Sequence, residues 1–91
     1  MAKTARKMIT QNELKDVLTK RLKLQNPMFR LERAGRKQSG SIVSETFEGW
    51  NDAERQKKIW SALDGEYGSD SVMLVGTLLA YTLAEWNVQL D

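Results

Sequence analysis

The fold of this chain is decided by one stretch, FEGWNDAERQKKIWSAL at residues 47–63. Gly49 suits a tight turn, because glycine adopts backbone angles that other residues avoid. Asn51 suits the N-cap of a helix, since its side-chain oxygen can accept a hydrogen bond from a free backbone N–H in the first turn. Glu54 follows at the spacing of a capping box. The stretch therefore predicts the end of a strand, a turn and a capped helix.

The same stretch predicts one apolar face along that helix. Its hydrophobic residues recur at helical spacing: Ile59, Trp60, Leu63 and Tyr67. Trp60 lies within this register, so we expect it in the core. The basic residues Arg55, Lys57 and Lys58 are expected largely off the face. Changing all three to alanine should then leave the fold intact.

Elsewhere, hydrophobic periodicity and cap signals predict further elements. They are a helix over residues 11–23, strands over residues 28–33, 41–47 and 72–80, and a short helix from residue 82. The element order α-β-β-α-β-α predicts an α+β fold, in which helices cover one face of a three-stranded sheet. We expect residues 1–9 to be a flexible basic tail and residues 10–91 to form a single domain.

Local signals mark the boundaries of these elements. Thr10 with Glu13, and Thr82 with Glu85, repeat the capping-box spacing. A polar, glycine-flanked connection over residues 35–40 is short enough for a hairpin. The central helix is expected to end between residues 65 and 68, where glycine can take a left-handed conformation.

The 91 residues contain no cysteine and no histidine. Disulfides, thiol nucleophiles and the commonest metal ligand are therefore excluded, and we expect no cofactor. An enzyme would depend on carboxylates, lysines or hydroxyls, so a non-enzymatic protein is favoured. No run approaches the roughly 20 apolar residues that span a bilayer, and no apolar segment follows the basic N-terminus. We expect no membrane association and a cytoplasmic location.

Charge is distributed unevenly along the chain. Residues 1–37 contain 11 basic and three acidic residues, whereas residues 38–91 contain three basic and nine acidic residues. Such polarity can steer an anionic partner towards the basic half. The simpler alternative, which we favour, is that the two halves lie side by side and neutralise each other.

Three other patterns have a functional and a structural interpretation. Gly65-x-x-Gly68 has the spacing of a nucleic-acid clamp, but its position after a helix favours a helix stop. Carboxylates cluster at Asp64, Glu66 and Asp70, where a solvated loop is favoured over a cation site because the spacing is not that of an EF-hand. Trp50 and Trp86 are candidates for a partly exposed stacking platform or partner anchor.

The central stretch resembles the signature F-x-G-x5-R-H-R-x-V-Y-x-x-L of the BolA proteins. The matching positions are Phe47, Gly49, Arg55-Gln56-Lys57, Ile59, Trp60 and Leu63. The segment Tyr81 to Trp86 is similar to the family's closing Y-T-P-E-E-W. The resemblance spans about residues 10–88. It implies the BolA fold, which is like the type II KH fold, and it implies an association with monothiol glutaredoxins, iron–sulfur clusters and, in bacteria, transcriptional regulation.

The chain departs from this pattern at the positions that would ligate a cluster. Gln56 stands where the signature has histidine, and Val72 to Leu74 occupy the neighbourhood of the family's third-strand histidine. The loop that often carries a cysteine or histidine ligand is cut to about residues 35–40. Cluster binding is therefore not expected to carry over.

These observations predict a non-enzymatic BolA-like binding or regulatory domain that has lost iron–sulfur ligation and acts through a protein partner. The resemblance implies a glutaredoxin-like partner. The alternatives are a KH-like module that binds DNA or RNA, and a small enzyme that uses carboxylates and lysines. The predicted contact residues are Arg33, Arg36, Lys37, Arg55, Lys57, Lys58 and Trp86.

The lack of thiols and imidazoles generates a prediction about metal content. The purified protein should retain neither zinc nor an iron–sulfur cluster, because it contains no cysteine and no histidine. Elemental analysis after gel filtration measures this directly. Stoichiometric metal bound without thiolate ligands would contradict the prediction.

Overall fold

The computed structural model describes residues 8–90. Its elements, in chain order, are α1 (Gln11–Leu22), β1 (Met28–Ala34), β2 (Lys37–Val43), the 3₁₀ turn η1 (Glu45–Phe47), α2 (Asp52–Tyr67), the 3₁₀ turn η2 (Gly68–Asp70), the single helical turn α3 (Ser71–Leu74), β3 (Val75–Tyr81) and α4 (Leu83–Leu90).

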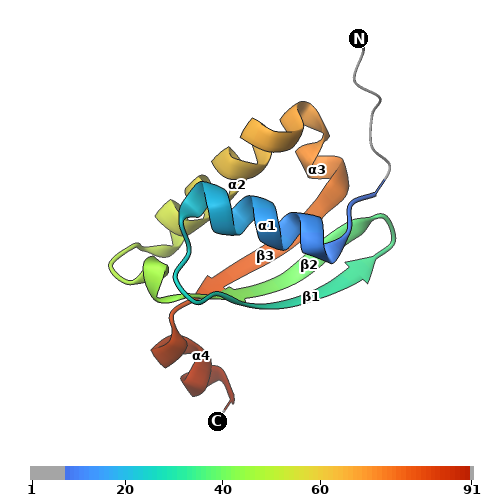
Figure 1. Cartoon of the computed structure of the whole chain (residues 1–91). Helices are drawn as coiled ribbons and strands as arrows, with labels where there is room; N and C mark the ends of the chain where they lie inside the picture. The colour runs from blue at the N-terminus through green and yellow to red at the C-terminus, as the bar shows by residue number, and fades with distance from the viewer. Residues whose placement is uncertain (1–7, 91) are drawn as a thin grey trace.

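The strands form one mixed sheet in the order β1-β2-β3. β1 and β2 pair antiparallel as a hairpin, whereas β2 and β3 pair parallel. A parallel pair needs a crossover connection, and α2 provides it. Figure 1 shows α1 and α2 side by side over one face of the sheet and α4 beyond the end of β3. The predicted α+β fold with a three-stranded sheet is confirmed.

Each of the three predicted capping boxes is present. In each box the side chain of the cap residue accepts from the backbone N–H of a glutamate, whose carboxylate accepts from the backbone N–H of the cap. The pairs are Thr10 with Glu13, Asn51 with Glu54 and Thr82 with Glu85. Each box satisfies two N–H groups that have no partner within the helix. α2 ends as predicted at Gly68, which has a φ of +62°.

The hydrophobic core lies between the sheet and the helix pair. Its fully buried members include Leu14, Leu18, Ile42, Phe47, Ile59, Leu63 and Leu78. The expected apolar face of α2 is confirmed for Ile59 and Leu63. Trp60 is only partly buried against the core.

The second strand begins and ends earlier than predicted. Residues 37–40 belong to β2, and the hairpin turn contains only Gly35 and Arg36. The strand ends at Val43 because the hydroxyl of Ser44 donates to the carbonyl of Gln25 at 2.9 Å and accepts from the N–H of Thr46 at 3.2 Å. This hydroxyl starts η1, from which Phe47 enters the core.

The apolar run at residues 72–80 is only partly a strand. Ser71 to Leu74 form α3, and the side chains of Val72 and Met73 are each 59% exposed. The buried hydroxyl of Ser71 donates to the carboxylate of Asp64 at 2.5 Å, which fixes the helical turn to the end of α2. The strand therefore begins at Val75 and not at Val72.

The expected N-terminal tail falls mostly outside the described residues, which begin at residue 8. Ile9, however, is a core residue with 1% of its surface exposed. Its carbonyl accepts hydrogen bonds from Arg33 at 2.8 Å and from Gln38 at 3.2 Å. Ile9, which was expected in the tail, therefore belongs to the hydrophobic core.

The packing of the two aromatic residues predicts different effects on stability. Phe47→Ala should lower the free energy of unfolding by roughly 3–5 kcal/mol, because it removes a fully buried ring. Trp60→Ala should lower it by about half as much, because part of that ring is already in water. Urea unfolding of both variants tests the order. An equal or larger loss for Trp60→Ala would show that its ring is a core element.

Candidate functional site

The predicted contact residues do not form one surface. Arg33, Arg36 and Lys37 lie at the hairpin end of β1 and β2, whereas Lys57 and Lys58 lie in the first half of α2. The chain enters α2 after the far end of β2, so these two groups lie at opposite ends of the sheet (Figure 1). The structure therefore does not bring these two groups of basic residues together.

Arg55 is buried, which corrects its predicted position off the apolar face. Only 5% of the residue is exposed. Its Nε donates to the carbonyl of Trp50 at 2.8 Å, and its Nη1 donates to the carbonyl of Ala80 at 3.1 Å. Its two terminal nitrogens also donate to the two carboxylate oxygens of Glu85, at 2.6 and 3.2 Å. The guanidinium therefore joins α2, β3 and α4 and is not free to contact a partner.

The ion pair between Arg55 and Glu85 is stable in its charged form. The hydrogen bond from Arg55 lowers the pKa of Glu85, and the backbone N–H of Thr82 lowers it further. The hydrogen bond with Glu85 raises the pKa of Arg55 against the opposing effect of burial. Both groups are thus ionised at neutral pH. The sequence signal for this pair was the arginine of the BolA-like signature together with the glutamate of the closing segment.

Gln56 also has a structural role. Its Nε2 donates to the carbonyl of Leu78 at 2.7 Å. Arg55 donates to Ala80, two residues further along the same strand. Alternate residues of a strand direct their carbonyls to the same side, so both carbonyls lie on the edge of β3 that faces away from β2. α2 therefore caps this edge with side chains, and Gln56 does so at the position where the BolA signature has histidine.

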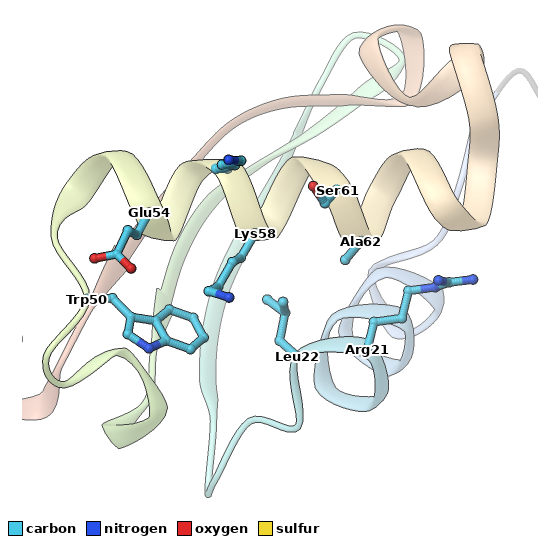
Figure 2. Close-up of a pocket in the computed structure, with 8 residues that line it drawn as sticks. Arg21, Leu22, Trp50, Glu54, Lys58, Ser61 and Ala62 are labelled. Carbon is cyan, nitrogen blue, oxygen red and sulfur yellow. The ribbon is translucent and has the colours of Figure 1, made fainter.

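The remaining two predicted residues of α2 line a groove. It lies between the end of α1 and the first half of α2, and its volume is about 630 Å³. The lining includes Arg21, Leu22, Trp50, Lys57, Lys58 and Ala62. Figure 2 shows Trp50, Lys58 and Leu22 around one space, with Arg21 at the side of α1.

Trp50 is held in a defined orientation at this groove. Its ring meets that of Phe47 edge-on, with centroids 5.8 Å apart, and Phe47 is fully buried. The ammonium of Lys58 lies over the ring of Trp50, 5.0 Å from its centroid. A cation at this distance is attracted to the face of the ring. The groove therefore presents a fixed aromatic wall beside a cation.

The charge of the groove is positive. Arg21 pairs with Glu66 at 3.2 Å, so its charge is partly neutralised. Within residues 8–90, Lys57 makes no ion pair and no hydrogen bond through its side chain. Glu54 is the one acidic residue in the lining, and its carboxylate accepts from the N–H of Asn51. The groove therefore combines an aromatic side chain with more basic than acidic residues.

Trp86 lies away from this groove. Its ring packs against Tyr81 with centroids 5.3 Å apart, and the guanidinium of Arg30 lies 5.7 Å from its centroid. Trp86 is partly buried, as expected. These contacts place it at the junction of α4 with the sheet face that α1 and α2 leave open.

Two of the alternative patterns resolve in the structure. Gly68 is the C-cap of α2, so Gly65-x-x-Gly68 is a helix stop. Within the described part of the chain, no group of three or more acidic side chains could hold a metal ion.

In the same part of the chain, no helix is long and apolar enough to cross a bilayer.

The hydrogen bonds of Arg55 with Trp50, Ala80 and Glu85 generate a prediction about stability. Arg55→Ala should lower the free energy of unfolding by about 3 kcal/mol, because it leaves the carbonyl of Ala80 without a donor and Glu85 without its cation. Lys57→Ala is the matched control on the same helix and should change little. Similar losses of unfolding free energy for the two variants would contradict a stabilising role of these hydrogen bonds.

The same pair predicts a pH dependence. The pKa of Glu85 is lowered in the folded state, so its stabilising effect is complete above the ordinary glutamate pKa of about 4.3. The effect is lost as the pH falls through the lowered value. The difference in unfolding free energy between wild type and Glu85→Gln should therefore shrink below about pH 4. Urea titrations at several pH values measure it.

The chain resembles known proteins in its structure rather than in its sequence. No family profile and no curated protein matches the sequence. Solved structures do match. A BolA homologue from Coxiella burnetii is 23% identical, with a TM-score of 0.66, over 88% of this chain and 99% of that one.

Two further structures give the same result. A BolA-like protein from Babesia bovis is 21% identical, with a TM-score of 0.60, over 91% of this chain and 95% of that one. The BolA domain of SufE1 from Arabidopsis thaliana is 23% identical, with a TM-score of 0.60, over 85% of this chain and 98% of that one. The chain therefore has the fold of the BolA proteins.

Proposed function

We propose that this chain is a non-enzymatic binding domain with regulatory function, which contacts a protein partner through the groove between α1 and α2. The observation that carries the proposal is the fixed ring of Trp50 beside Lys57 and Lys58. Interface energy concentrates on well-packed aromatic residues, and charges around them steer association. This groove combines both features.

The occupant that fits the groove is an acidic segment with one apolar side chain. The apolar side chain would rest on Trp50, Leu22 and Ala62. The acidic groups would face Lys57 and Lys58, both of which are exposed. Because Trp50 is already held by Phe47, ordering it on binding requires little loss of side-chain entropy.

The proposal includes the loss of iron–sulfur ligation. The sequence offers neither thiolate nor imidazole, and Gln56 is engaged with the carbonyl of Leu78. Binding therefore has to rest on the protein surface rather than on a shared cluster. The resemblance to BolA proteins makes a monothiol glutaredoxin from the same organism the first partner to test.

DNA or RNA is the alternative ligand. The observation that favours it is the basic hairpin end, where Arg36 and Lys37 are exposed next to Arg33. Against it, the residues around Gly65-x-x-Gly68 include Asp64, Glu66 and Asp70, which would repel phosphate groups. The two basic groups lie at opposite ends of the sheet, so they can be tested separately.

The test compares two double charge reversals that differ only in position. Lys57→Glu/Lys58→Glu should weaken binding to the glutaredoxin by about tenfold or more, because both charges at the groove are reversed. Arg36→Glu/Lys37→Glu should leave that binding unchanged. Calorimetric titration measures both, and thermal melts confirm that both variants fold.

The opposite pattern would contradict the proposal. If only the hairpin variant loses affinity, the partner contacts the other end of the sheet. If wild type binds labelled single-stranded DNA or RNA instead, with an affinity that falls steeply with salt, the ligand is a nucleic acid. If it binds neither the glutaredoxin nor the oligonucleotides, the proposed partner class is wrong.

A further inference from the structure

Among residues 8–90, no strand pairs with the outer edge of β1. β1 pairs with β2 along one edge only, and it is the first strand in the sheet order. The carbonyl of Arg30 points to β2, where it lies close to Gly40. The carbonyl of Leu31 points the other way and accepts from the side chain of Gln11 at 3.1 Å. By the alternation of a strand, the backbone groups of Phe29, Leu31 and Arg33 therefore face outward.

The two edges of the sheet differ in how they are protected. On β3, the outward carbonyls of Leu78 and Ala80 accept hydrogen bonds from side chains of α2. On β1, the carbonyl of Leu31 accepts from Gln11, and no other outward backbone group accepts a side-chain bond within the described residues. An open hollow of about 660 Å³ extends along this strand past Leu31, Glu32 and Trp86. β1 is thus the edge at which another strand can add.

We propose that a second copy of this chain pairs with β1 in antiparallel orientation, with the two-fold axis at Leu31. The strand runs from Met28 to Ala34, so Leu31 is its midpoint and all seven residues find a partner. The residues whose backbone groups face outward then lie opposite residues of the second copy whose backbone groups also face outward. Leu31 lies opposite Leu31 of the second copy, and Phe29 lies opposite its Arg33. This surface does not include the groove between α1 and α2.

The charges on β1 select this register. With the axis at Leu31, Arg30 lies opposite Glu32 of the second copy, and Glu32 lies opposite its Arg30. Opposite charges at directly facing positions stabilise an antiparallel pair, and like charges destabilise it. Shifting the axis by one residue in either direction places Arg30 opposite Arg30 or Glu32 opposite Glu32. The strand is therefore complementary to itself in the one register that also pairs its whole length.

The side chains needed for these contacts are accessible. Arg30 and Glu32 are both exposed. Arg30 rests over the ring of Trp86, which holds it on the open face of the sheet. Within the described residues, Glu32 makes no ion pair and no side-chain hydrogen bond. Both charges are thus available to a second copy.

Charge-reversal variants test the register. Glu32→Arg and Arg30→Glu should each weaken self-association by about tenfold or more, because each creates two like-charged pairs per dimer. An equimolar mixture of the two single variants should form a mixed dimer, since every facing pair is then of opposite charge. The double variant Arg30→Glu/Glu32→Arg should again self-associate. Glu45→Arg, an exposed acid outside the strand, is the matched control and should behave as wild type. Sedimentation velocity over a concentration series gives the dimer fraction.

A second measurement identifies the edge itself. The backbone N–H groups of Phe29, Leu31 and Arg33 should become protected from hydrogen exchange as the protein concentration rises, whereas those of β3 should not change. A wild-type chain that stays monomeric at millimolar concentration would overturn the proposal. So would a dimer in which these three amides stay unprotected, or single variants that associate as well as wild type.

Discussion

The guanidinium of Arg55 is the interaction on which the arrangement of the C-terminal half depends. It binds the carbonyl of Trp50 before α2, the carbonyl of Ala80 at the end of β3 and the carboxylate of Glu85 in α4. A planar guanidinium has five N–H donors in a fixed geometry, which allows it to bind a carboxylate through two hydrogen bonds and still donate to carbonyls, whereas an ammonium has only three donors. The cost of burying its charge is offset because its donors meet a carboxylate and two carbonyls. The same residue thereby holds the backbone at Trp50, whose side chain lines the candidate groove.

The two edges of the sheet differ in whether side chains of the same chain bind their backbone groups. Arg55 and Gln56 close the edge of β3, so the signature positions that resemble those of BolA proteins serve the fold here. The two surfaces proposed above for binding are the groove beside Lys57 and Lys58 and the outer edge of β1. An unpaired strand edge is a template for pairing, and its register is determined by the side chains that it exposes. The two proposed contacts would therefore lie at separate places, one between the helices and the other at an edge of the sheet.

The uneven charge of the chain is partly resolved by packing. α1, from the basic half, lies beside α2, from the acidic half, and Arg21 forms an ion pair with Glu66 across them. This contact supports mutual neutralisation of the halves at that point. Lys57 and Lys58 are exceptions, because they are basic, exposed and located in the acidic half. Their position at the mouth of a groove gives a physical reason to assign them to binding rather than to folding.

The sequence alone determined the features that depend on residues within about four positions of each other. The capping boxes, the apolar face of α2 and the end of that helix near Gly68 were visible in the spacing of residues, and the lack of cysteine and histidine was visible in the composition. The tertiary structure decided the rest. Ser44 ends β2 by donating a hydrogen bond to Gln25, which is 19 residues away in the sequence. Arg55 is buried against Glu85, which is 30 residues away. Such distant pairs leave no periodic signal in the sequence, because whether the two residues meet depends on how the chain between them folds. In the same way, only the folded sheet shows that side chains of α2 bind the edge of β3.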